Sequence, residues 1–283
     1  MMKNPYPLYL LVACCVFLIG SNLFGEEVLR ENIPYLRNGL PIQTLTVFRP
    51  ENAETLLPAV VMYHGGSWKK GTPGQLAQLG NYLAERGIVL VSAGYRLVGK
   101  QTEDVGDCVK DAIVAYDWVC RNAESIGVDP DRIAVGGASA GGQLGLSVAL
   151  LSDSAFEEIA GSERQAPLAY LGLNPVVDTN DPRFLKTFEE YGDDFNPVAL
   201  LEGGAHLPPT FIAHGQKDAV VPLNTVERFA EIATDQGDEV EIMIFEGQSH
   251  GFFNPRKGRE KMLNELYVAV FGFLSESFDS AGS

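Results

Sequence analysis

A serine between small residues is the first feature of this sequence that could carry out covalent chemistry. Ser139 lies in the segment GASAG, between the apolar run RIAV and a stretch typical of a helix. The pattern G-x-S-x-G between a strand and a helix is typical of a sharp turn that strains the serine backbone and exposes its hydroxyl group. The alternatives are an ordinary glycine-rich turn between a strand and a helix, or a dinucleotide-binding loop, whose G-x-G-x-x-G spacing differs from the spacing here. We therefore interpret Ser139 as a nucleophile.

A serine hydroxyl is a poor nucleophile near neutral pH and needs a base, which a carboxylate in turn orients. His250, in EGQSHGFF, follows the last predicted strand, where a loop can bring its imidazole over the serine. Asp218, in HGQKDAVVP, follows the preceding strand and is the predicted acid, with Asp178 in NPVVD as the competitor. The sequence thus predicts that Ser139, Asp218 and His250 act together.

The remaining histidines receive structural interpretations. His64 lies in a glycine-rich loop, His206 in an irregular stretch typical of the surface, and His214 at the end of a predicted strand. Scattered histidines, without H-E-x-x-H or paired cysteine spacing, do not predict a metal site. We expect the chemistry to need no metal and no cofactor.

A second stretch with chemical potential is the segment HGGSW, which follows the apolar run LPAVVMY. It could be a tight turn and nothing more, or it could present unshielded N–H groups to a negative charge. The tetrahedral intermediate of acyl transfer carries an oxyanion, which preset N–H donors stabilise. We expect these donors to come from Ala140, directly after the serine, and from Gly65 and Gly66. The S-x-x-K match of Ser67 to Lys70 lacks the S-D-N and K-T-G partners and is interpreted as coincidence.

Three further side chains near these motifs are expected to be structural. Trp68 and Tyr95 are candidate pocket walls, but such aromatic residues more often belong to the core or its rim. Arg96 is expected to form a structural ion pair with Asp107 or Asp111 near the site.

The elements that must position these residues alternate along the chain. An Asn38-Gly39 pair between β-leaning runs predicts an antiparallel hairpin near the N-terminus. Continuous apolar strands predict a mostly parallel sheet with helices on both faces, an α/β fold. Residues 178–208 form the longest irregular insertion, and such loops shape the ligand crevice of a parallel sheet. The predicted strands cover residues 57–63, 88–95, 132–137, 168–177, 209–215 and 239–247, and the predicted helices cover 73–87, 102–127, 141–151, 223–237 and 259–278.

Length and charge limit the classes of protein to consider. The chain has 283 residues, of which 46% are apolar, and no linker or internal repeat, which indicates one domain. Its formal net charge of −16 argues against a nucleic-acid partner, because phosphate binding needs clustered lysine and arginine. The sequence makes no prediction of an oligomeric state.

The N-terminal residues have the pattern of an export signal. Lys3 precedes an apolar run over residues 8–20, and small residues follow it. This pattern predicts a signal peptide over residues 1–25, a catalytic domain over 26–283, and a periplasmic or extracellular protein. The segment LVAC also resembles a bacterial lipobox, so a lipid anchor on Cys14 is the minority alternative and the only expected contact with a membrane besides the leader. Cys108 and Cys120 lie on one predicted helix about 18 Å apart, too far for a disulfide.

Together these segments resemble α/β-hydrolase esterases that carry an HGG loop, a group that includes hormone-sensitive-lipase-like esterases and bacterial acetyl-xylan or feruloyl esterase-like proteins. The resemblance rests on HGGSW, SAGYRL, GVDPDRIAVGGASAGGQL, PPTFIAHGQKDAVVP and FEGQSHGFF, which span most of residues 45–255. It implies the chain order nucleophile, acid, base, with Ser139, Asp218 and His250 in these roles. It also implies an oxyanion hole of Gly65, Gly66 and Ala140. Ser67 replaces the third glycine of the lipase-like branch, which favours the carbohydrate-esterase and arylformamidase-like branches.

The resulting functional hypothesis is a serine esterase that hydrolyses short-acyl carboxylic esters through an acyl-enzyme, with acetyl groups on carbohydrate as one candidate substrate. The expected partner is therefore a small-molecule or carbohydrate ester. Two alternatives stay open, an arylformamidase-like amidase or peptidase of the same fold and a non-catalytic binding protein. The second is disfavoured because a binding protein has no need of all three reactive residues.

Overall fold

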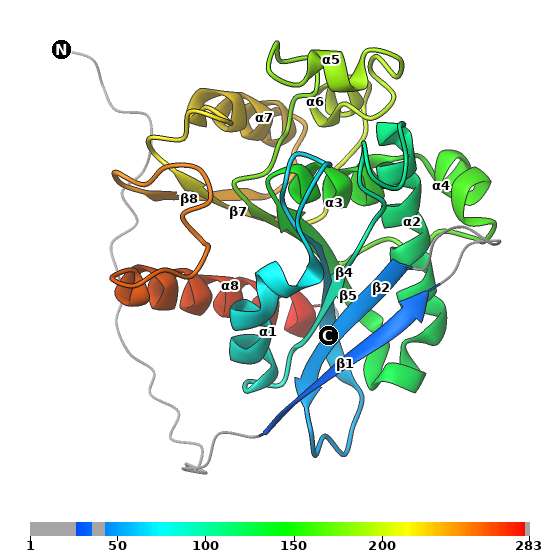
Figure 1. Ribbon diagram of the computed structural model, residues 1–283, viewed down its shortest axis with the longest axis vertical. Helices are drawn as coiled ribbons and strands as arrows, with labels where there is room; N and C mark the ends of the chain where they lie inside the picture. Colours follow the sequence, from blue (N-terminus) through cyan, green and yellow to red (C-terminus); the bar gives the residue numbers. More distant parts are fainter. Residues whose placement is uncertain (1–26, 36–42, 281–283) are drawn as a thin grey trace.

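The computed structural model describes residues 27–35 and 43–280. Within this part of the chain, eight strands form one sheet in the order β1-β2-β4-β3-β5-β6-β7-β8 (Figure 1). The strands are β1 (Val28–Tyr35), β2 (Gln43–Pro50), β3 (Leu57–Tyr63), β4 (Val89–Ala93), β5 (Val128–Ala138), β6 (Tyr170–Leu173), β7 (Thr210–Gly215) and β8 (Val240–Phe245).

The first two strands form the antiparallel part of the sheet. β1 pairs with β2 along its whole length, from Val28 opposite Pro50 to Tyr35 opposite Gln43. β2 is also antiparallel to β4, and all later neighbours are parallel. The predicted antiparallel start of a mostly parallel sheet is therefore confirmed, while the predicted turn at Asn38-Gly39 lies outside the described residues.

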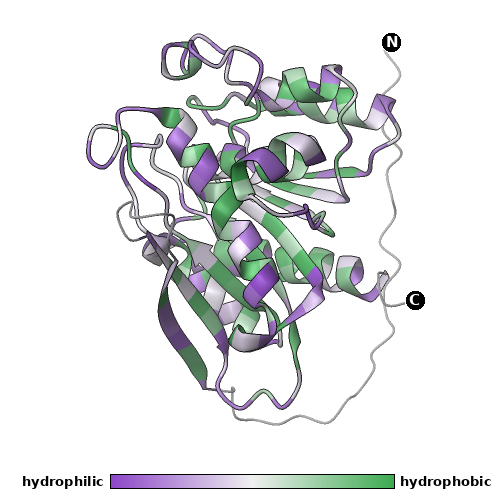
Figure 2. Cartoon of the chain, turned by 90° about the vertical axis from the view of Figure 1, so that its right-hand side faces the viewer, coloured by the Kyte–Doolittle hydropathy of each residue, from purple (hydrophilic) through white to green (hydrophobic). Residues whose placement is uncertain are grey.

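Helices cover both faces of the sheet, as the continuous apolar strands predicted. α1 and α8 pack on one face, and α2, α3 and α7 with three shorter helices pack on the other (Figure 1). Figure 2 shows hydrophobic residues concentrated on the central strands, while the helices carry both hydrophobic and hydrophilic residues. The helices are α1 (Ala77–Ala84), α2 (Val105–Asn122), α3 (Ala140–Leu150), α4 (Asp153–Ala160), α5 (Leu185–Phe188), α6 (Pro197–Glu202), α7 (Leu223–Asp235) and α8 (Glu260–Ser280), with 3₁₀ turns η1 (Pro73–Leu76) and η2 (Glu124–Ile126).

Local chemistry sets the limits of the long helix α2. Asp104 caps its first turn by accepting a hydrogen bond from the Gly106 N–H at 2.8 Å, which satisfies a donor that has no partner inside the helix. The helix therefore begins three residues later than predicted. Cys108 and Cys120 both lie on it as free thiols, so the prediction that they do not pair is confirmed. Within the described ranges, no helix combines the length and the apolar composition needed to span a membrane.

The insertion over residues 178–208 is more ordered than predicted, because α5 and α6 lie within it. α6 begins where Asn196 accepts a hydrogen bond from the Val198 N–H at 3.2 Å and Pro197 occupies the first turn. Helices of four and six residues are too short to produce a periodic apolar pattern, and capping and packing stabilise them instead.

Parallel pairing gives the functional residues a common edge. β3, β5, β7 and β8 run in the same direction, so their carboxyl ends meet at one edge of the sheet. The loop after β3 carries the HGGSW segment, the turn after β5 carries Ser139, and the loops after β7 and β8 carry Asp218 and His250. This edge is where open α/β sheets bind ligands.

Candidate active site

Ser139 occupies a strained turn between β5 and α3. Its φ of 53° is in the left-handed region, a conformation that costs about 1–3 kcal/mol and persists only when the surroundings enforce it. Four backbone hydrogen bonds do so here. The Ser139 N–H donates to the Leu173 carbonyl at 3.0 Å. The Ser139 carbonyl accepts from the N–H groups of Gly142, Gln143 and Val176 at 2.9, 3.3 and 3.0 Å.

The flanking glycines of the predicted motif have a steric explanation. A Cβ on Gly137 would lie 2.1 Å from the Gly141 carbonyl oxygen, and a Cβ on Gly141 would lie 2.1 Å from the Tyr63 carbonyl oxygen. The strand, the turn and the helix therefore approach each other too closely for any side chain. The structure thus has the strand–turn–helix geometry that the sequence predicted for Ser139.

The structure brings the three predicted residues into one hydrogen-bonded row. The Ser139 hydroxyl lies 2.8 Å from Nε2 of His250, and Nδ1 of His250 lies 2.7 Å from Oδ2 of Asp218. The carboxylate can only accept, so Nδ1 carries the proton and Nε2 is free to accept the serine proton. This arrangement activates a serine hydroxyl as a nucleophile.

The environment of Asp218 keeps it ionised. Burial by itself would raise the pKa of Asp218, but hydrogen bonds from His250 and from the N–H groups of Val221 and Val220 outweigh it, so the pKa lies below its usual value. The two N–H groups each donate to Oδ1 at 2.9 Å. Oδ2 accepts the hydrogen bond from His250, and Nε2 of His214 lies 3.7 Å from the same oxygen.

The competing acid, Asp178, lies in a different setting. Its Oδ1 accepts hydrogen bonds from the Asn180 N–H at 2.9 Å and from Nδ2 of Asn196 at 3.0 Å. These contacts tie together the insertion that contains α5 and α6. The carboxylate against His250 is Asp218.

The three other histidines have the structural settings that the sequence analysis expected. His64 is buried and stacks on the ring of Tyr95, and burial lowers its pKa to about 4, so it is neutral. His214 is buried and donates from Nε2 to the Val221 carbonyl at 2.9 Å. His206 is exposed and lies 2.8 Å from Asp238.

We refer to residues 64–68 as the oxyanion loop. It lies directly against the nucleophile, since a Cβ on Gly65 would be 3.3 Å from Cβ of Ser139 and 3.1 Å from the Ala138 carbonyl oxygen. At Gly66 the φ of +134° and a position 1.9 Å from the Lys70 carbonyl oxygen exclude a side chain. The glycines of the HGGSW segment therefore permit both a close approach and an unusual backbone conformation.

The structure revises the predicted set of oxyanion donors. The Gly65 N–H donates to Oε1 of Gln75 at 2.7 Å, so it is not available to a substrate, and the sequence prediction differs from the structure here. Across the described ranges, no hydrogen bond engages the N–H of Gly66 or of Ala140, the first residue of α3. Ser67 was not predicted as a donor, but its N–H also has no hydrogen-bond partner among the described residues, so it is an additional candidate donor.

Buried side chains hold the oxyanion loop in place. The Tyr95 hydroxyl donates to the His64 carbonyl at 2.8 Å, and Nε1 of Trp68 donates to Oε1 of Gln143 on α3 at 3.2 Å. Trp68 also packs edge-on against Phe188 of the insertion, with ring centroids 5.0 Å apart. Trp68 and Tyr95 are each 2% exposed, so both belong to the core.

The expected ion pair of Arg96 is present. Its guanidinium donates to both carboxylate oxygens of Asp111, at 2.9 and 2.8 Å, and to Asp107 at 2.8 Å. Arg96 and Asp111 are both buried. The pair therefore joins the segment after β4 to α2 and has a structural role.

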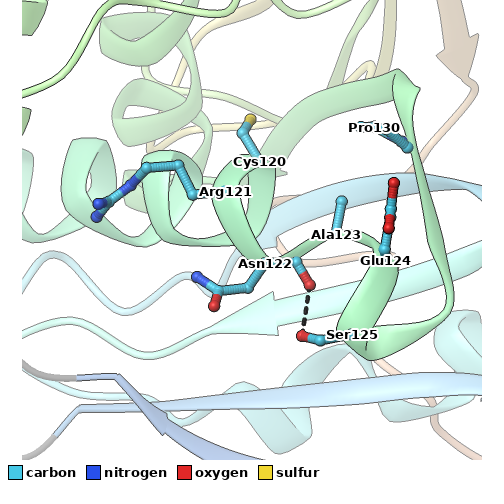
Figure 3. A pocket seen from close by; sticks show the side chains of 7 residues that line it. All are labelled: Cys120, Arg121, Asn122, Ala123, Glu124, Ser125 and Pro130. Carbon is cyan, nitrogen blue, oxygen red and sulfur yellow. Dashed lines mark hydrogen bonds between the residues drawn. The ribbon is translucent and has the colours of Figure 1, made fainter.

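A pocket of about 570 Å³ lies at the opposite edge of the sheet (Figure 3). It is lined by the end of α2, including Cys120, and by Pro130 in β5. β5 leads from this pocket at its first residues to Ser139, which directly follows its last residue. Burial raises the pKa of Cys120 to about 12, so its thiol is not ionised near neutral pH. This pocket is therefore separate from the serine.

In the described part of the chain, no group of three His, Cys, Asp or Glu side chains could hold a metal ion.

Comparison with known families agrees with this geometry. The family model BD-FAE matches residues 45–203, from β2 through α6. The chain belongs to the BD-FAE family. A second family model, the dienelactone hydrolase family, matches residues 180–276. The BD-FAE match therefore contains the oxyanion loop and Ser139, and the second match contains Asp218 and His250.

Individual relatives of this BD-FAE chain are esterases. A probable isoprenylcysteine alpha-carbonyl methylesterase, ICMEL1 of Oryza sativa subsp. japonica, is 30% identical over 93% of this chain and 69% of its own length. ICME of Arabidopsis thaliana is 28% identical, and this chain spans only 64% of its length. Carboxylesterase NlhH of Mycobacterium tuberculosis is 28% identical over 90% of this chain and 87% of its own length.

Solved structures give the same result. Propionate-bound Est2, a thermophilic esterase of the planctomycete Thermogutta terrifontis, is 31% identical with a TM-score of 0.77 and covers 90% of this chain and 96% of its own. The same esterase phosphorylated by paraoxon is 30% identical with a TM-score of 0.78, over 87% and 94% of the two chains. This BD-FAE member therefore has the α/β-hydrolase fold and is a serine carboxylic ester hydrolase.

Proposed function

We propose that Ser139, His250 and Asp218 form a catalytic triad that hydrolyses short-acyl carboxylic esters through an acyl-enzyme. The observation that carries this proposal is the row of contacts from the Ser139 hydroxyl to His250 at 2.8 Å and from His250 to Asp218 at 2.7 Å. The strained turn that presents the serine gives independent support.

In the first half of the reaction the Ser139 oxygen attacks the ester carbonyl carbon while Nε2 of His250 takes the hydroxyl proton. The carbonyl oxygen becomes an oxyanion, and the N–H groups of Gly66 and Ala140 donate to it. Asp218, ionised because its pKa is lowered, stabilises the imidazolium. When the intermediate collapses, the bond to the alcohol oxygen breaks and His250 returns the proton to the leaving alcohol.

In the second half, water attacks the acyl-enzyme and His250 accepts one of its protons. Collapse of the second tetrahedral intermediate releases the carboxylic acid and restores the Ser139 hydroxyl. Every proton moves through one imidazole, so no cofactor is required for this sequence of steps.

The preference for short acyl groups is supported by two related structures, of Est2 with propionate bound and of Est2 with butyrate bound. Acetyl groups on carbohydrate are a candidate substrate class within this range. Its support is the resemblance of the HGGSW segment to carbohydrate esterases and the proposed export of the protein. Methyl esters are the competing class, because the plant relatives carry methylesterase names.

The test is turnover of p-nitrophenyl esters with acetyl, propionyl, butyryl and octanoyl groups by the full chain, alongside Ser139→Ala and a control, Ser125→Ala, at the pocket of Figure 3. We expect the highest kcat/KM among the acyl chains of two to four carbons, wild-type rates for the control and only background for Ser139→Ala. Acetyl-xylan and N-acetyl-prenylcysteine methyl ester then separate the two substrate classes. Activity that persists in Ser139→Ala would refute the proposed nucleophile.

Export is part of the same proposal. Residues 1–25 lie outside the described residues, and their apolar run after Lys3 supports a cleaved leader. The intact mass of the protein recovered from a bacterial periplasm tests it. Loss of a segment that ends near residue 25 is expected, and retention of that segment would contradict it. A diacylglycerol adduct on Cys14 would instead support the lipobox alternative.

A further inference from the structure

A row of side-chain amides connects the oxyanion loop to the loop that carries His250. The Gly65 N–H donates to Oε1 of Gln75 at 2.7 Å, and Nε2 of Gln75 donates to Oδ1 of Asn254 at 3.1 Å. Nδ2 of Asn254 then donates to the Gly251 carbonyl at 2.9 Å. Three bonds thus join two segments that are far apart in the sequence, and Gly251 directly follows His250.

The direction of this row is fixed at both ends. A main-chain N–H can only donate, so the oxygen of Gln75 must face Gly65. A main-chain carbonyl can only accept, so the nitrogen of Asn254 must face Gly251. The remaining nitrogen of Gln75 then meets the remaining oxygen of Asn254, and each amide has one orientation that satisfies all three bonds.

The segment after His250 has a second anchor on the sheet. The Gly251 N–H donates to Oδ1 of Asn174 at 3.0 Å, and the Asn174 N–H donates to the Ala213 carbonyl at 2.8 Å. Asn174 is fully buried directly after β6. Asn174 therefore ties Gly251 to the sheet, while Gln75 and Asn254 tie it to the oxyanion loop.

The two ends of the amide row adjoin the groups that act on the two charges of the proposed transition state. The peptide of Gly65 precedes the N–H of Gly66, which faces the oxyanion, and Gly251 adjoins His250, which becomes an imidazolium. Donors stabilise the oxyanion only when they lie within hydrogen-bond distance of the oxygen in the transition state. Misplacement by about 1 Å can lower the rate about 10²-fold.

We propose that Gln75 is a positioning residue that, through Asn254, holds the oxyanion loop and the His250 loop in register for the formation of the tetrahedral intermediate. This rests on the catalytic roles proposed above. Gln75 touches no reacting atom in this proposal, and its effect is on the placement of the Gly66 N–H and of the imidazole. Its loss should therefore lower kcat while KM for a small ester stays nearly constant.

The experiment compares Gln75→Ala, Asn254→Ala and the double variant with the full wild-type chain on p-nitrophenyl acetate. Gln78→Ala is the matched control, because Gln78 is exposed on the neighbouring helix α1 and lies outside the amide row. We expect kcat to fall about tenfold in each single variant, with KM within about twofold of wild type. The double variant should be no slower than the slower single variant, because both substitutions break one row.

A transition-state analogue provides a readout that a merely structural role would not move. The affinity of a trifluoromethyl ketone, which forms a tetrahedral adduct, should weaken by the same factor by which kcat/KM falls. Gln75→Glu is the second variant, in case Gln75→Ala does not fold. It keeps an acceptor for Gly65 and places a carboxylate oxygen against Oδ1 of Asn254, so it should match Asn254→Ala.

The outcomes separate this proposal from the proposed function. If Ser139→Ala is inactive but Gln75→Ala and Gln75→Glu keep the wild-type kcat, the positioning role is wrong and the triad stands. Additive losses in the double variant, or a rise in KM with unchanged kcat, would also overturn the positioning role. If Ser139→Ala retains activity, the proposed function itself fails.

Discussion

Replacement of Asp218 by asparagine should abolish most activity because of the way the backbone holds this side chain. The Val220 and Val221 N–H groups both donate to Oδ1 at 2.9 Å. In Asp218→Asn they would hold the amide oxygen in that position and leave the NH₂ group facing Nδ1 of His250. Nδ1 must then accept, so the proton moves to Nε2, and His250 can no longer take the proton of Ser139.

The size of the effect follows from the alternative orientation of the new amide. In Asp218→Asn, a flipped side chain would restore the acceptor toward His250 but would leave two buried N–H donors without partners, at about 1–3 kcal/mol each. The active orientation is therefore disfavoured by about 2–6 kcal/mol, which corresponds to about 30-fold to 10⁴-fold in population. Loss of the negative charge beside the imidazolium adds to this, so we expect kcat/KM to fall about 10⁴-fold.

The assay is steady-state hydrolysis of p-nitrophenyl acetate, with the melting temperature measured on the same samples. Asp178→Asn is the matched control, because that carboxylate accepts from Asn180 and Asn196 and not from His250. We expect the control to keep kcat/KM within a few-fold of wild type. A loss of less than tenfold in Asp218→Asn, or an equal loss in Asp178→Asn, would refute this assignment of the acid.

Three other perturbations test separate parts of the structure. Gly66→Ala should lower kcat about 10²-fold, because the new Cβ would lie 1.9 Å from the Lys70 carbonyl oxygen and displace the loop. The control is Gly87→Ala, at a φ of +80° with no atom within 4 Å, which should lose stability but keep kcat. Equal kcat values for the two variants would contradict the role of Gly66. Burial lowers the pKa of His64 from 6.5 to about 4, so the unfolded chain binds the proton first and stability falls as the pH falls from 6.5 to 4, by up to about 3 kcal/mol. Urea titrations at pH 7 and pH 4.5 should show a smaller fall in His64→Phe, and an equal fall would count against a neutral His64. Cys108 is fully buried, and burial raises the pKa of its thiol to about 12, so iodoacetamide at pH 8 should not modify it until the protein unfolds. Rapid labelling of Cys108, located by peptide mapping, would contradict its burial.

Much of the fold follows from local patterns. Residues 57–63 were predicted as a strand from an apolar run, and β3 has these bounds, because a strand buried on both faces must be apolar throughout. The helices α4, α5 and α6 were not predicted. Their stability depends on caps such as Ser152, which accepts from the Ala155 N–H at 3.3 Å, and on tertiary packing, neither of which leaves a periodic signal in the sequence.

The site also contains features that the sequence predicted and features that only the structure shows. Ser139, Asp218 and His250 were predicted because parallel strands bring their carboxyl ends to one edge, and each residue lies in the turn or loop that follows a strand. The direction of the Gly65 N–H was not predictable, since it depends on Gln75, which lies ten residues later. A glutamine in that position carries no sequence signal of its own, and the structure is needed to show its partner.

The role of Ser139 as the nucleophile can be tested by trapping it covalently. The full chain is incubated with paraoxon, which phosphorylates the related esterase, and the modified residue is located by mass spectrometry of its peptides. We expect one diethylphosphoryl group on Ser139, loss of activity in proportion to its incorporation, and no adduct in Ser139→Ala. An adduct on another residue with loss of activity, or full activity in the completely phosphorylated protein, would contradict it.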